Sequence, residues 1–349
     1  MKMDEIIYLA DARKSSGYGN LSRVRSLSEQ IRSTRKKIII KTESDFFLQL
    51  KNNTYDEYHL PPSDVYQEVS SLNKFFASTR SRYLVTDLFA GEYLKQPNKF
   101  IDYHMAIKES LGDVKLITID DARLLTKKNS YSNLSIVSNT SEKYSAVENK
   151  RIVGPAFTIF SSSLLDAKRY LNDKKKYKFF ISFGGVDCSF DTYKVIEALY
   201  LIKLASPDEG VKVVIGKAFP DWYINKIRDF CKKAGYEFTF FYEDYFKDVA
   251  LSKFVICGEG ATKLDALALG VLPIVITQFD HFSKPIRDFI DSGLSYYFGK
   301  SSDFSPKKFS EYIGFVLRDT CGYQKKREKG MEIYDGLGGA RISRSINNL

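Results

Sequence analysis

Short apolar runs alternate with stretches of helical periodicity along the whole chain. The periodicity is clear at residues 22–32, where Val24, Leu27 and Ile31 recur at spacings of three and four and predict one apolar helical face. In the first half, strands are predicted at residues 6–10, 37–41, 82–86 and 115–119, with helices at 22–32, 44–51 and 94–111. Strands that alternate with helices predict a parallel sheet with crossover connections, and therefore an α/β fold.

The same alternation restarts after a break near residues 150–178. Gly154-Pro155 is a turn signal, and residues 172–176 form a polar, charged run. Beyond the break, strands are predicted at 179–183, 211–215, 238–242, 254–257 and 272–276, with helices at 192–204, 222–233, 245–252 and 261–269. We therefore expect two domains, 1–157 and 158–320, and a helical tail, 321–349, that packs back toward the N-terminal domain.

Length and composition agree with an ordinary globular protein of two domains. The chain has 349 residues, of which 44% are hydrophobic and 28% charged. Its longest apolar runs hold about five to seven residues, against the roughly 20 needed to cross a bilayer. The first ten residues have a short apolar core beside Asp4 and Glu5, so no secretory signal is expected there. The expected location is the cytoplasm.

The sequence predicts neither a metal site nor a disulfide framework. The four cysteines, at 188, 231, 257 and 321, include no pair at CxxC spacing, and the three histidines, at 59, 104 and 281, are scattered. Reduced cytosolic thiols are the simpler interpretation. We therefore expect a protein that requires no cofactor.

The charge balance is basic, with 53 lysines and arginines against 43 acidic residues and a formal net charge of +10. A basic chain favours anionic partners, such as a nucleotide diphosphate, an acidic membrane face or a nucleic acid. For scattered lysines, a solvated lysine-rich surface is the preferred interpretation. No stripe of alternating aromatic and basic residues supports nucleic-acid binding, so none is expected. Peripheral contact with an anionic membrane face is left open.

Candidate chemistry in the first half lies at the carboxyl ends of the predicted strands, where open α/β sheets bind their ligands. Gly17, Tyr18 and Gly19 form a turn directly after the first strand, and two glycines there allow a ligand to approach the backbone. A helix that starts at this point needs a tight turn for structural reasons alone. Carboxylates at strand ends are candidate bases or substrate binders, or simple helix caps: Asp11, Asp87, Asp120 and Asp121.

The second half has two glycine-rich turns after strands. Gly184 and Gly185 follow the first strand of this half. The second turn joins a strand to a helix whose free N–H groups and dipole favour a diphosphate; it contains Gly258, Glu259, Gly260, Ala261 and Thr262. Asp265, one turn into that helix, is placed to accept both ribose hydroxyls, or only to favour the positive end of the helix dipole. His281 follows a later strand and is a further candidate base, as are His59 and His104 unless they are structural or solvated.

Eight short motifs in order carry a resemblance to a known family. They are Asp11-Ala12 with the 17–20 turn and Arg23, residues 85–87, residues 119–121, Gly154-Pro155, residues 182–187, residues 258–262, residues 266–270 and residues 335–342. In these the chain resembles the UDP-sugar hydrolase of the pseudaminic acid pathway and the related spore-coat polysaccharide proteins. Those in turn look like the transferase that adds N-acetylglucosamine to the lipid-linked peptidoglycan precursor. The resemblance implies the GT-B fold, in which two Rossmann-like domains with parallel sheets face a central cleft.

The chain departs from the family pattern at positions that carry chemistry. The first loop of the family ends in a histidine, thought to act as a base, and this chain has Asn20, whose amide cannot take a proton near neutral pH. Glu259 stands for a glycine of the family's turn, and Asp265 for a glutamate on the helix. His281-Phe282 replaces an Asn-Gln pair. The departures concern the hydrolytic base and the substrate more than nucleotide binding, which depends largely on backbone N–H groups.

These observations lead to a nucleotide-sugar-dependent glycosyltransferase of bacterial surface-polysaccharide or glycoconjugate biosynthesis. The resemblance implies that the C-terminal domain binds a UDP-sugar donor at Gly184, Gly185, residues 258–262 and Asp265. The N-terminal domain then binds a sugar or glycan acceptor, and the catalytic candidates are Asp11, Asn20, Asp87 and His281. The alternatives are a UDP-sugar hydrolase of the pseudaminic acid pathway type and a non-catalytic protein that binds sugar nucleotides.

Overall fold

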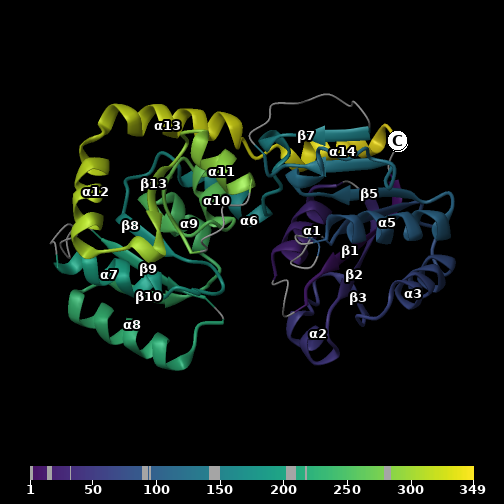
Figure 1. Ribbon diagram of the computed structural model, residues 1–349, viewed down its shortest axis with the longest axis horizontal. Helices are drawn as coiled ribbons and strands as arrows, with labels where there is room; N and C mark the ends of the chain where they lie inside the picture. Colours follow the sequence, from purple (N-terminus) through teal and green to yellow (C-terminus); the bar gives the residue numbers. More distant parts are fainter. Residues whose placement is uncertain are drawn as a thin grey trace. The chain divides into compact units, whose positions relative to one another are not determined.

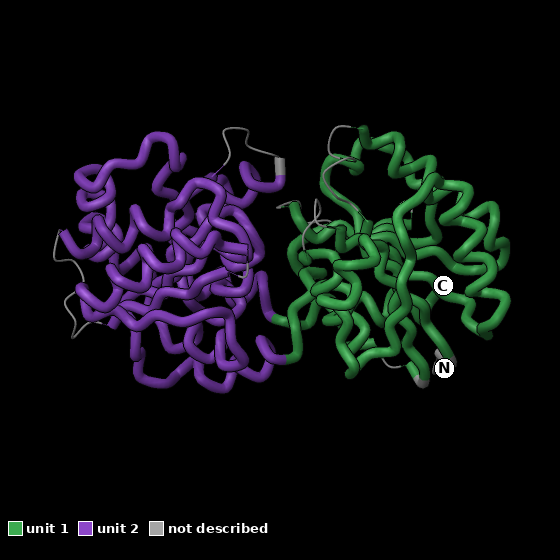
Figure 2. The backbone as a smooth tube through the Cα atoms, turned by 90° about the horizontal axis from the view of Figure 1, so that it is seen from below, with its two compact units in different colours: residues 1–162, 336–349 green, residues 163–335 purple. Residues whose placement is uncertain are grey.

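The computed structural model divides the chain into two compact units (Figure 2). Unit 1 comprises Met1–Ser162 and Gly336–Leu349, and unit 2 comprises Ser163–Asp335. The structure describes residues 3–13, 18–31, 33–88, 93, 96–140, 150–201, 210–216, 218–278 and 284–349. Each unit is built around its own sheet, and none of the described helices is long and apolar enough to cross a membrane.

Unit 1 contains a seven-stranded sheet of order β3-β2-β1-β4-β5-β6-β7, in which every pair of neighbours is parallel. Its elements appear in purple to teal in Figure 1, with the last helix in yellow. They are β1 (Met3–Asp11), α1 (Gly19–Gln30), β2 (Ser33–Lys41), α2 (Ser44–Leu50), β3 (Asp56–Leu60), α3 (Val65–Ala77), β4 (Tyr83–Asp87), α5 (Pro97–Leu111), β5 (Lys115–Ile119), β6 (Leu134–Val137), β7 (Arg151–Val153) and α14 (Gly338–Asn347). The short 3-10 turns are η1 (Ala122–Leu124) and η3 (Pro155–Phe157).

Alternation along β1 sorts its side chains into two cores, one on each face of the sheet. Ile6 and Tyr8 pack in a cluster that contains residues of α1 and α14, whereas Ile7 and Leu9 pack in a cluster that contains residues of α3 and α5. Because successive side chains of a strand point to opposite faces, a parallel strand covered on both faces must be apolar throughout. This explains why β1 has a continuous apolar run.

The C-terminal segment completes the core of unit 1. Ile342 and Ile346 of α14 are fully buried against the cluster that includes Leu21 and Val24 of α1. A Cβ atom on Gly338 would collide with the backbone carbonyl oxygen of Thr158, so only glycine allows this helix to start where it does. Whereas residues 321–349 were expected to act as one tail, the structure divides them between α13 in unit 2 and α14 in unit 1.

Unit 2 contains a six-stranded parallel sheet of order β10-β9-β8-β11-β12-β13. Its elements are α6 (Ser162–Ala167), β8 (Tyr177–Ser182), α7 (Asp191–Leu201), β9 (Val211–Ile215), α8 (Asp221–Ala234), β10 (Glu237–Phe240), α9 (Tyr245–Ala250), β11 (Ser252–Cys257), α10 (Thr262–Ala268), β12 (Leu272–Thr277), α11 (Lys284–Asp291), β13 (Tyr296–Lys300), α12 (Pro306–Arg318) and α13 (Thr320–Ile333), with 3-10 turns η4 (Lys168–Tyr170) and η6 (Ser301–Asp303). The predicted α/β class with parallel sheets is confirmed.

Each sheet has one point where the strand order reverses. In unit 1 the chain moves outward from β1 to β2 and β3, then returns to the other side of β1 at β4; in unit 2 it does the same around β8, with β11 on the returning side. Ligands of open α/β sheets bind beyond the carboxyl ends of the strands at such a reversal. The carboxyl ends of β1, β4, β8 and β11 therefore lie where binding is expected, and the sequence analysis places candidate residues at each of them.

Candidate functional site

Three of the four carboxylates at the strand ends of unit 1 interact electrostatically with one another or with Arg23. Asp11 ends β1, Asp87 ends β4, and Asp120 and Asp121 follow β5, which is the next strand in the sheet. The charge of Asp11 acts on Asp87, and the charge of Asp121 acts on the guanidinium of Arg23. The structure thus links Asp11, Asp87 and Asp121 electrostatically through Asp87 and Arg23, whereas Asp120 interacts with Tyr131, Ser135 and Arg151 instead.

Arg23 of α1 links two of the predicted site residues. Its Nε and Nη2 donate to the two carboxylate oxygens of Asp87 at 2.7 and 2.8 Å, and Nη2 also donates to Oδ1 of Asn20 at 2.9 Å. Asp87 is fully buried, which raises the pKa of its carboxyl, while the arginine opposes this shift. Arg23 was recognised in the sequence only as part of the resemblance, although its place one turn after Asn20 puts both side chains on one helix face.

The orientation of the Asn20 amide follows from this contact. An arginine can only donate, so the oxygen of Asn20 faces Arg23 and the Nδ2 group is turned elsewhere. Asn20 is only 7% exposed, and Nδ2 has no hydrogen-bond partner among the described residues. A buried amide donor without a partner is costly, and a bound acceptor oxygen would remove the cost.

The other strand-end carboxylates are held by different partners. Asp11 accepts from the backbone N–H of Arg13 at 3.2 Å and from its Nε at 3.0 and 3.1 Å. Asp120 accepts from the Tyr131 hydroxyl at 2.7 Å and from Ser135, and burial raises the pKa of Asp120.

Asp121 acts as the cap of η1. It accepts from the backbone N–H of Arg123 at 2.9 Å, from Nη2 of Arg123 at 2.8 Å and from Asn139 at 2.8 Å. Burial alone would raise the pKa of Asp121, but the hydrogen bonds from Arg123 outweigh burial and lower it. These are the contacts of a helix cap, which was one of the two interpretations of Asp121 from the sequence.

Only part of the predicted loop after β1 lies within the described residues. Tyr18 is exposed, with its ring 5.6 Å from that of Phe46, and Gly19 is the first residue of α1. Gly17 and the predicted catalytic residue His281 both lie outside the described residues.

The two remaining histidines are structural. His104 is completely buried, with Nδ1 2.7 Å from the carbonyl oxygen of Phe100 and Nε2 2.9 Å from the hydroxyl of Thr86. Burial lowers the pKa of His104 to about 4, so the ring is neutral at physiological pH. His59 has Nε2 2.8 Å from the carbonyl oxygen of Thr42 and stacks on Phe47. These contacts agree with the structural role that the sequence analysis left open for both histidines.

In unit 2, the Gly184-Gly185 turn after β8 is exposed and depends on glycine. Gly184 has φ of +78°, a left-handed conformation that other residues rarely adopt. The carbonyl oxygen of Gly185 accepts from the backbone N–H of Ala218 at 3.0 Å. A Cβ atom on Gly216, after β9, would collide with the carbonyl oxygens of both glycines. Neighbouring turns therefore pack backbone against backbone here.

A polar network ties the turns after β8, β11 and β12 together. Nε2 of Gln278 donates to Asp187 at 2.6 Å, and the backbone N–H of Gln278 donates to Oε2 of Glu259 at 2.9 Å. Asp187 also accepts from the backbone N–H groups at the start of α7 and from the Tyr223 hydroxyl at 2.8 Å. The Glu259 side chain thus acts as a brace between two turns.

The start of α10 has no side-chain cap, so its first-turn N–H groups are not satisfied by a side chain of the helix. Lys263 in that turn is buried, and its Nζ donates to the backbone carbonyl oxygens of Gly260, at 2.8 Å, and Glu259. Burial lowers the pKa of Lys263 to about 8. Its ammonium group therefore stabilises the turn of residues 258–261 through backbone carbonyl oxygens.

Asp265, the predicted ribose ligand, is half-buried on α10. Burial raises the pKa of its carboxyl to about 7, and the charge of Lys263 opposes this shift. Among the described residues, none donates a hydrogen bond to this carboxylate. A ligand hydroxyl would supply one.

No metal centre is formed by the part of the chain that the structure describes. No group of three or more His, Cys, Asp or Glu side chains within it is placed to hold an ion. The cysteines Cys231 and Cys257 are buried, and Cys188 and Cys321 are exposed, all four as free thiols.

Comparison with known proteins shows the fold. The structure is similar to MurG of Acinetobacter baumannii (TM-score 0.65, 12% identity, 99% of this chain and 100% of that chain). It is also similar to a UDP-GlcNAc 2-epimerase from Neisseria meningitidis bound to UDP-GlcNAc (TM-score 0.61, 13% identity, 99% of this chain and 100% of that chain). A third similar structure is a UDP-glucosyltransferase from Polygonum tinctorium (TM-score 0.64, 14% identity, 99% of this chain and 99% of that chain). No protein-family model and no curated protein sequence matches the chain.

These similarities confirm the predicted GT-B fold with two Rossmann-like domains. They extend over nearly the whole chain, but at identities this low they show the fold alone. None of these three structures is described as a hydrolase of the pseudaminic acid pathway, so they do not support that part of the resemblance.

For the Arg23–Asp87 ion pair, we expect the two single substitutions to lower the free energy of unfolding by unequal amounts. Arg23→Gln leaves Asp87 buried without its counter-charge and should cost about 3 kcal/mol in the free energy of unfolding, whereas Asp87→Asn should cost less, because the half-exposed Arg23 can reach water. The double variant should recover most of the loss. Urea denaturation followed by circular dichroism measures this, and fluorescence of Trp222, the only tryptophan, follows unit 2 as a control. Equal and additive losses would contradict the pairing.

His104 predicts a pH dependence of stability. Its folded pKa of about 4 lies below the ordinary value of 6.5, so its contribution is fully present above pH 6.5 and is lost as pH falls toward 4. The difference in unfolding free energy between the natural chain and His104→Gln should shrink by about 3 kcal/mol over that window. A difference that stays constant between pH 4 and 7 would show that His104 is not held neutral.

Proposed function

We propose that the protein is a nucleotide-sugar-dependent glycosyltransferase that binds a UDP-sugar donor in unit 2. The observation that carries this proposal is the convergence of the turns after β8 and β11 at the reversal point of a parallel sheet, joined by the network of Asp187, Gln278 and Glu259. Two of the similar structures support the donor class, since one is a UDP-glucosyltransferase and another is bound to UDP-GlcNAc.

Backbone groups perform most of the proposed binding. The exposed glycines Gly184, Gly185 and Gly260 leave room for a ligand, because a Cβ atom at any of them would meet nothing within 4 Å. The N–H groups of residues 260–262 and the dipole of α10 favour the negative charge of a diphosphate. That charge grows as the leaving group departs, so the same groups stabilise the transition state. Lys263 and Glu259 keep this turn rigid.

In unit 1, we assign the sugar or glycan acceptor to the strand-end region near Tyr18, Gly19, Asn20, Asp87, Asp120 and Asp121. Asn20 presents an amide donor, which can hold a hydroxyl oxygen but cannot remove a proton. Asp11 and Asp87 are each engaged by an arginine, so they orient Arg13 and Arg23.

Hydrolysis of a UDP-sugar is the alternative reaction, and it needs a base that activates water. The residue at the position of the family base cannot serve, because Oδ1 of Asn20 accepts from Arg23 and Nδ2 is a donor. This argues against the hydrolytic mechanism of the pseudaminic acid pathway family, and transfer to an acceptor hydroxyl likewise needs a proton acceptor other than Asn20.

Incubation of the full chain with UDP-glucose and UDP-GlcNAc, with and without saccharide acceptors, separates the reactions. Acceptor-dependent release of UDP supports transfer, and free sugar without acceptor supports hydrolysis. A chain that binds UDP by calorimetry and releases nothing in either arm would be a binding protein, and the enzyme proposal would be wrong.

Asp265 predicts how nucleotide affinity depends on pH. Its carboxyl ionises through about pH 7, and the charged form accepts hydrogen bonds from ribose hydroxyls through both oxygens and more strongly than the neutral form, so the affinity for UDP should rise between pH 6 and 8. Asp265→Asn should weaken UDP binding about tenfold at pH 8 and flatten that rise. Asp229→Asn, on the exposed face of α8, is the matched control. Calorimetry that finds Asp265→Asn unchanged would remove Asp265 from the ribose site.

A further inference from the structure

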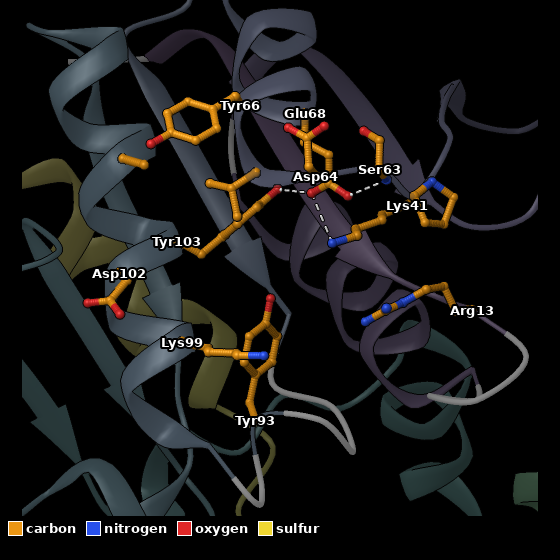
Figure 3. Close-up of a pocket in the computed structure, with 13 residues that line it drawn as sticks. Arg13, Lys41, Ser63, Asp64, Tyr66, Glu68, Tyr93, Lys99, Asp102 and Tyr103 are labelled. Atoms are coloured by element: carbon orange, nitrogen blue, oxygen red, sulfur yellow. Dashed lines mark hydrogen bonds and ion pairs between the residues drawn. The ribbon is translucent and has the colours of Figure 1, made fainter.

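A pocket of about 580 Å³, which was not predicted from the sequence, opens in unit 1 beyond the ends of β1, β2 and β3 (Figure 3). Its volume is in the range of sites for small ligands. The lining combines the first turn of α3, one face of α5 and the segment that follows β3. Lys41, Glu68, Lys99 and the rings of Tyr66, Tyr93 and Tyr103 are among the lining residues.

Buried polar side chains form one wall of this pocket. Glu68 accepts from Nζ of Lys41 at 2.9 Å, from the hydroxyl of Tyr103 at 2.6 Å and from the backbone N–H of Ser63 at 3.0 Å. Lys41, Glu68 and Tyr103 are each at least 95% buried. A buried ion pair is weak evidence for stability, because apolar residues of similar volume often stabilise a protein as well. Its presence along a cavity points to recognition of a polar ligand.

Lys41 retains donor capacity toward the pocket. Its ammonium has three N–H groups, and within the described residues Glu68 is its only hydrogen-bonding or ionic partner. Figure 3 shows Nζ of Lys41 turned to the middle of the view, with the ammonium of Lys99 on the opposite side. A ligand oxygen between them would meet donors from two elements.

Formal charges in the lining cancel. Three cations, Arg13, Lys41 and Lys99, stand beside three carboxylates, which belong to Asp64, Glu68 and Asp102. Two of the cations are already paired, Arg13 with Asp11 and Lys41 with Glu68. A diphosphate or a carboxylate would therefore gain little net attraction. A hydroxyl group both donates and accepts, so a ligand rich in hydroxyls matches such a mixture.

Aromatic rings supply the apolar part of the lining. Tyr66 is 88% exposed, so its ring is open to a ligand, and Tyr93 and Tyr103 are buried. In Figure 3, Tyr66 and Tyr93 lie on different sides of the opening. The C–H face of a sugar ring covers a tyrosine ring while its hydroxyls remain free for polar partners.

We propose that this pocket binds an uncharged sugar unit, with Tyr66 as the stacking surface and Lys41, Lys99 and the carboxylates as hydrogen-bonding partners. The inference rests on the proposed function, because it assigns one uncharged sugar unit of the acceptor to this pocket. Among the described residues, the pocket shares no lining residue with the region of Asn20 and Asp87, but its Arg13 is hydrogen-bonded to Asp11 at the end of β1. The inference excludes an acidic sugar or a lipid diphosphate as the group held in this pocket.

The test is saturation-transfer NMR on the full chain with two sets of probes. The neutral probes are cellobiose, lactose and chitobiose, and the anionic probes are glucuronic acid, N-acetylneuraminic acid and geranyl diphosphate. We expect saturation transfer to at least one neutral disaccharide and none to the anionic probes. Preference for an anionic probe, or no transfer to any neutral probe, would overturn the proposal.

Two variants of one exposed residue localise the binding. Tyr66→Ala should weaken the neutral-probe affinity about tenfold, and Tyr66→Phe, which keeps the ring, should retain it. Since Tyr66 is exposed, both variants should fold. Equal binding by the natural chain and Tyr66→Ala would place the sugar elsewhere and refute the pocket.

UDP binding in unit 2, measured in parallel, separates this proposal from the proposed function. If UDP binds normally while the sugar predictions fail, the pocket is wrong and the donor site stands. If UDP does not bind, the donor site fails whatever the pocket holds.

Discussion

The polar network around Asp187 and Gln278 is the constraint on which the account of unit 2 depends. Parallel strands end at one edge of their sheet, but nothing in that geometry alone fixes the turns that leave it. Here the side chain of Gln278 joins the turn after β8, and its backbone N–H joins the turn after β11 through Glu259. Asp187 also holds the start of α7. Preorganised backbone donors are effective because no free energy is lost in arranging them when the ligand arrives.

Unit 1 uses the same edge of its sheet for a different kind of site. Two arginines orient the carboxylates Asp11 and Asp87, and one of them also orients the amide of Asn20. The site therefore offers donors and fixed charges at the position where a histidine was expected from the resemblance. Such a site is suited to holding a polar partner, and the reaction then depends on how the partner is positioned beside the donor.

Local patterns allowed much of the fold to be predicted. Strands β8, β9, β11 and β12 were found because they are continuous apolar runs, as buried parallel strands must be. Strand β3, with Asp56 and Glu57, and strand β13, with Gly299, were missed, because their polar and flexible residues hide the pattern. The short strands β6 and β7 and helix α3 were missed as well.

The candidate site, too, could be predicted only in part from the sequence. Glycine turns at strand ends are local and were recognised, as was the departure at Asn20. The bond from Gln278 to Asp187 joins residues far apart in the chain, and the pocket of unit 1 combines segments from Arg13 to Ala106. The burial that lowers the pKa values of His104 and Lys263 also comes from packing between distant segments. None of these could be inferred from spacing.

The most direct test of the central claim is a titration of isotope-labelled protein with UDP, observed by amide NMR. The account predicts that the largest shifts fall on the backbone amides of Gly184, Gly185 and residues 258–262, with little change in unit 1. Shifts confined to unit 1, or none at saturating UDP, would contradict it.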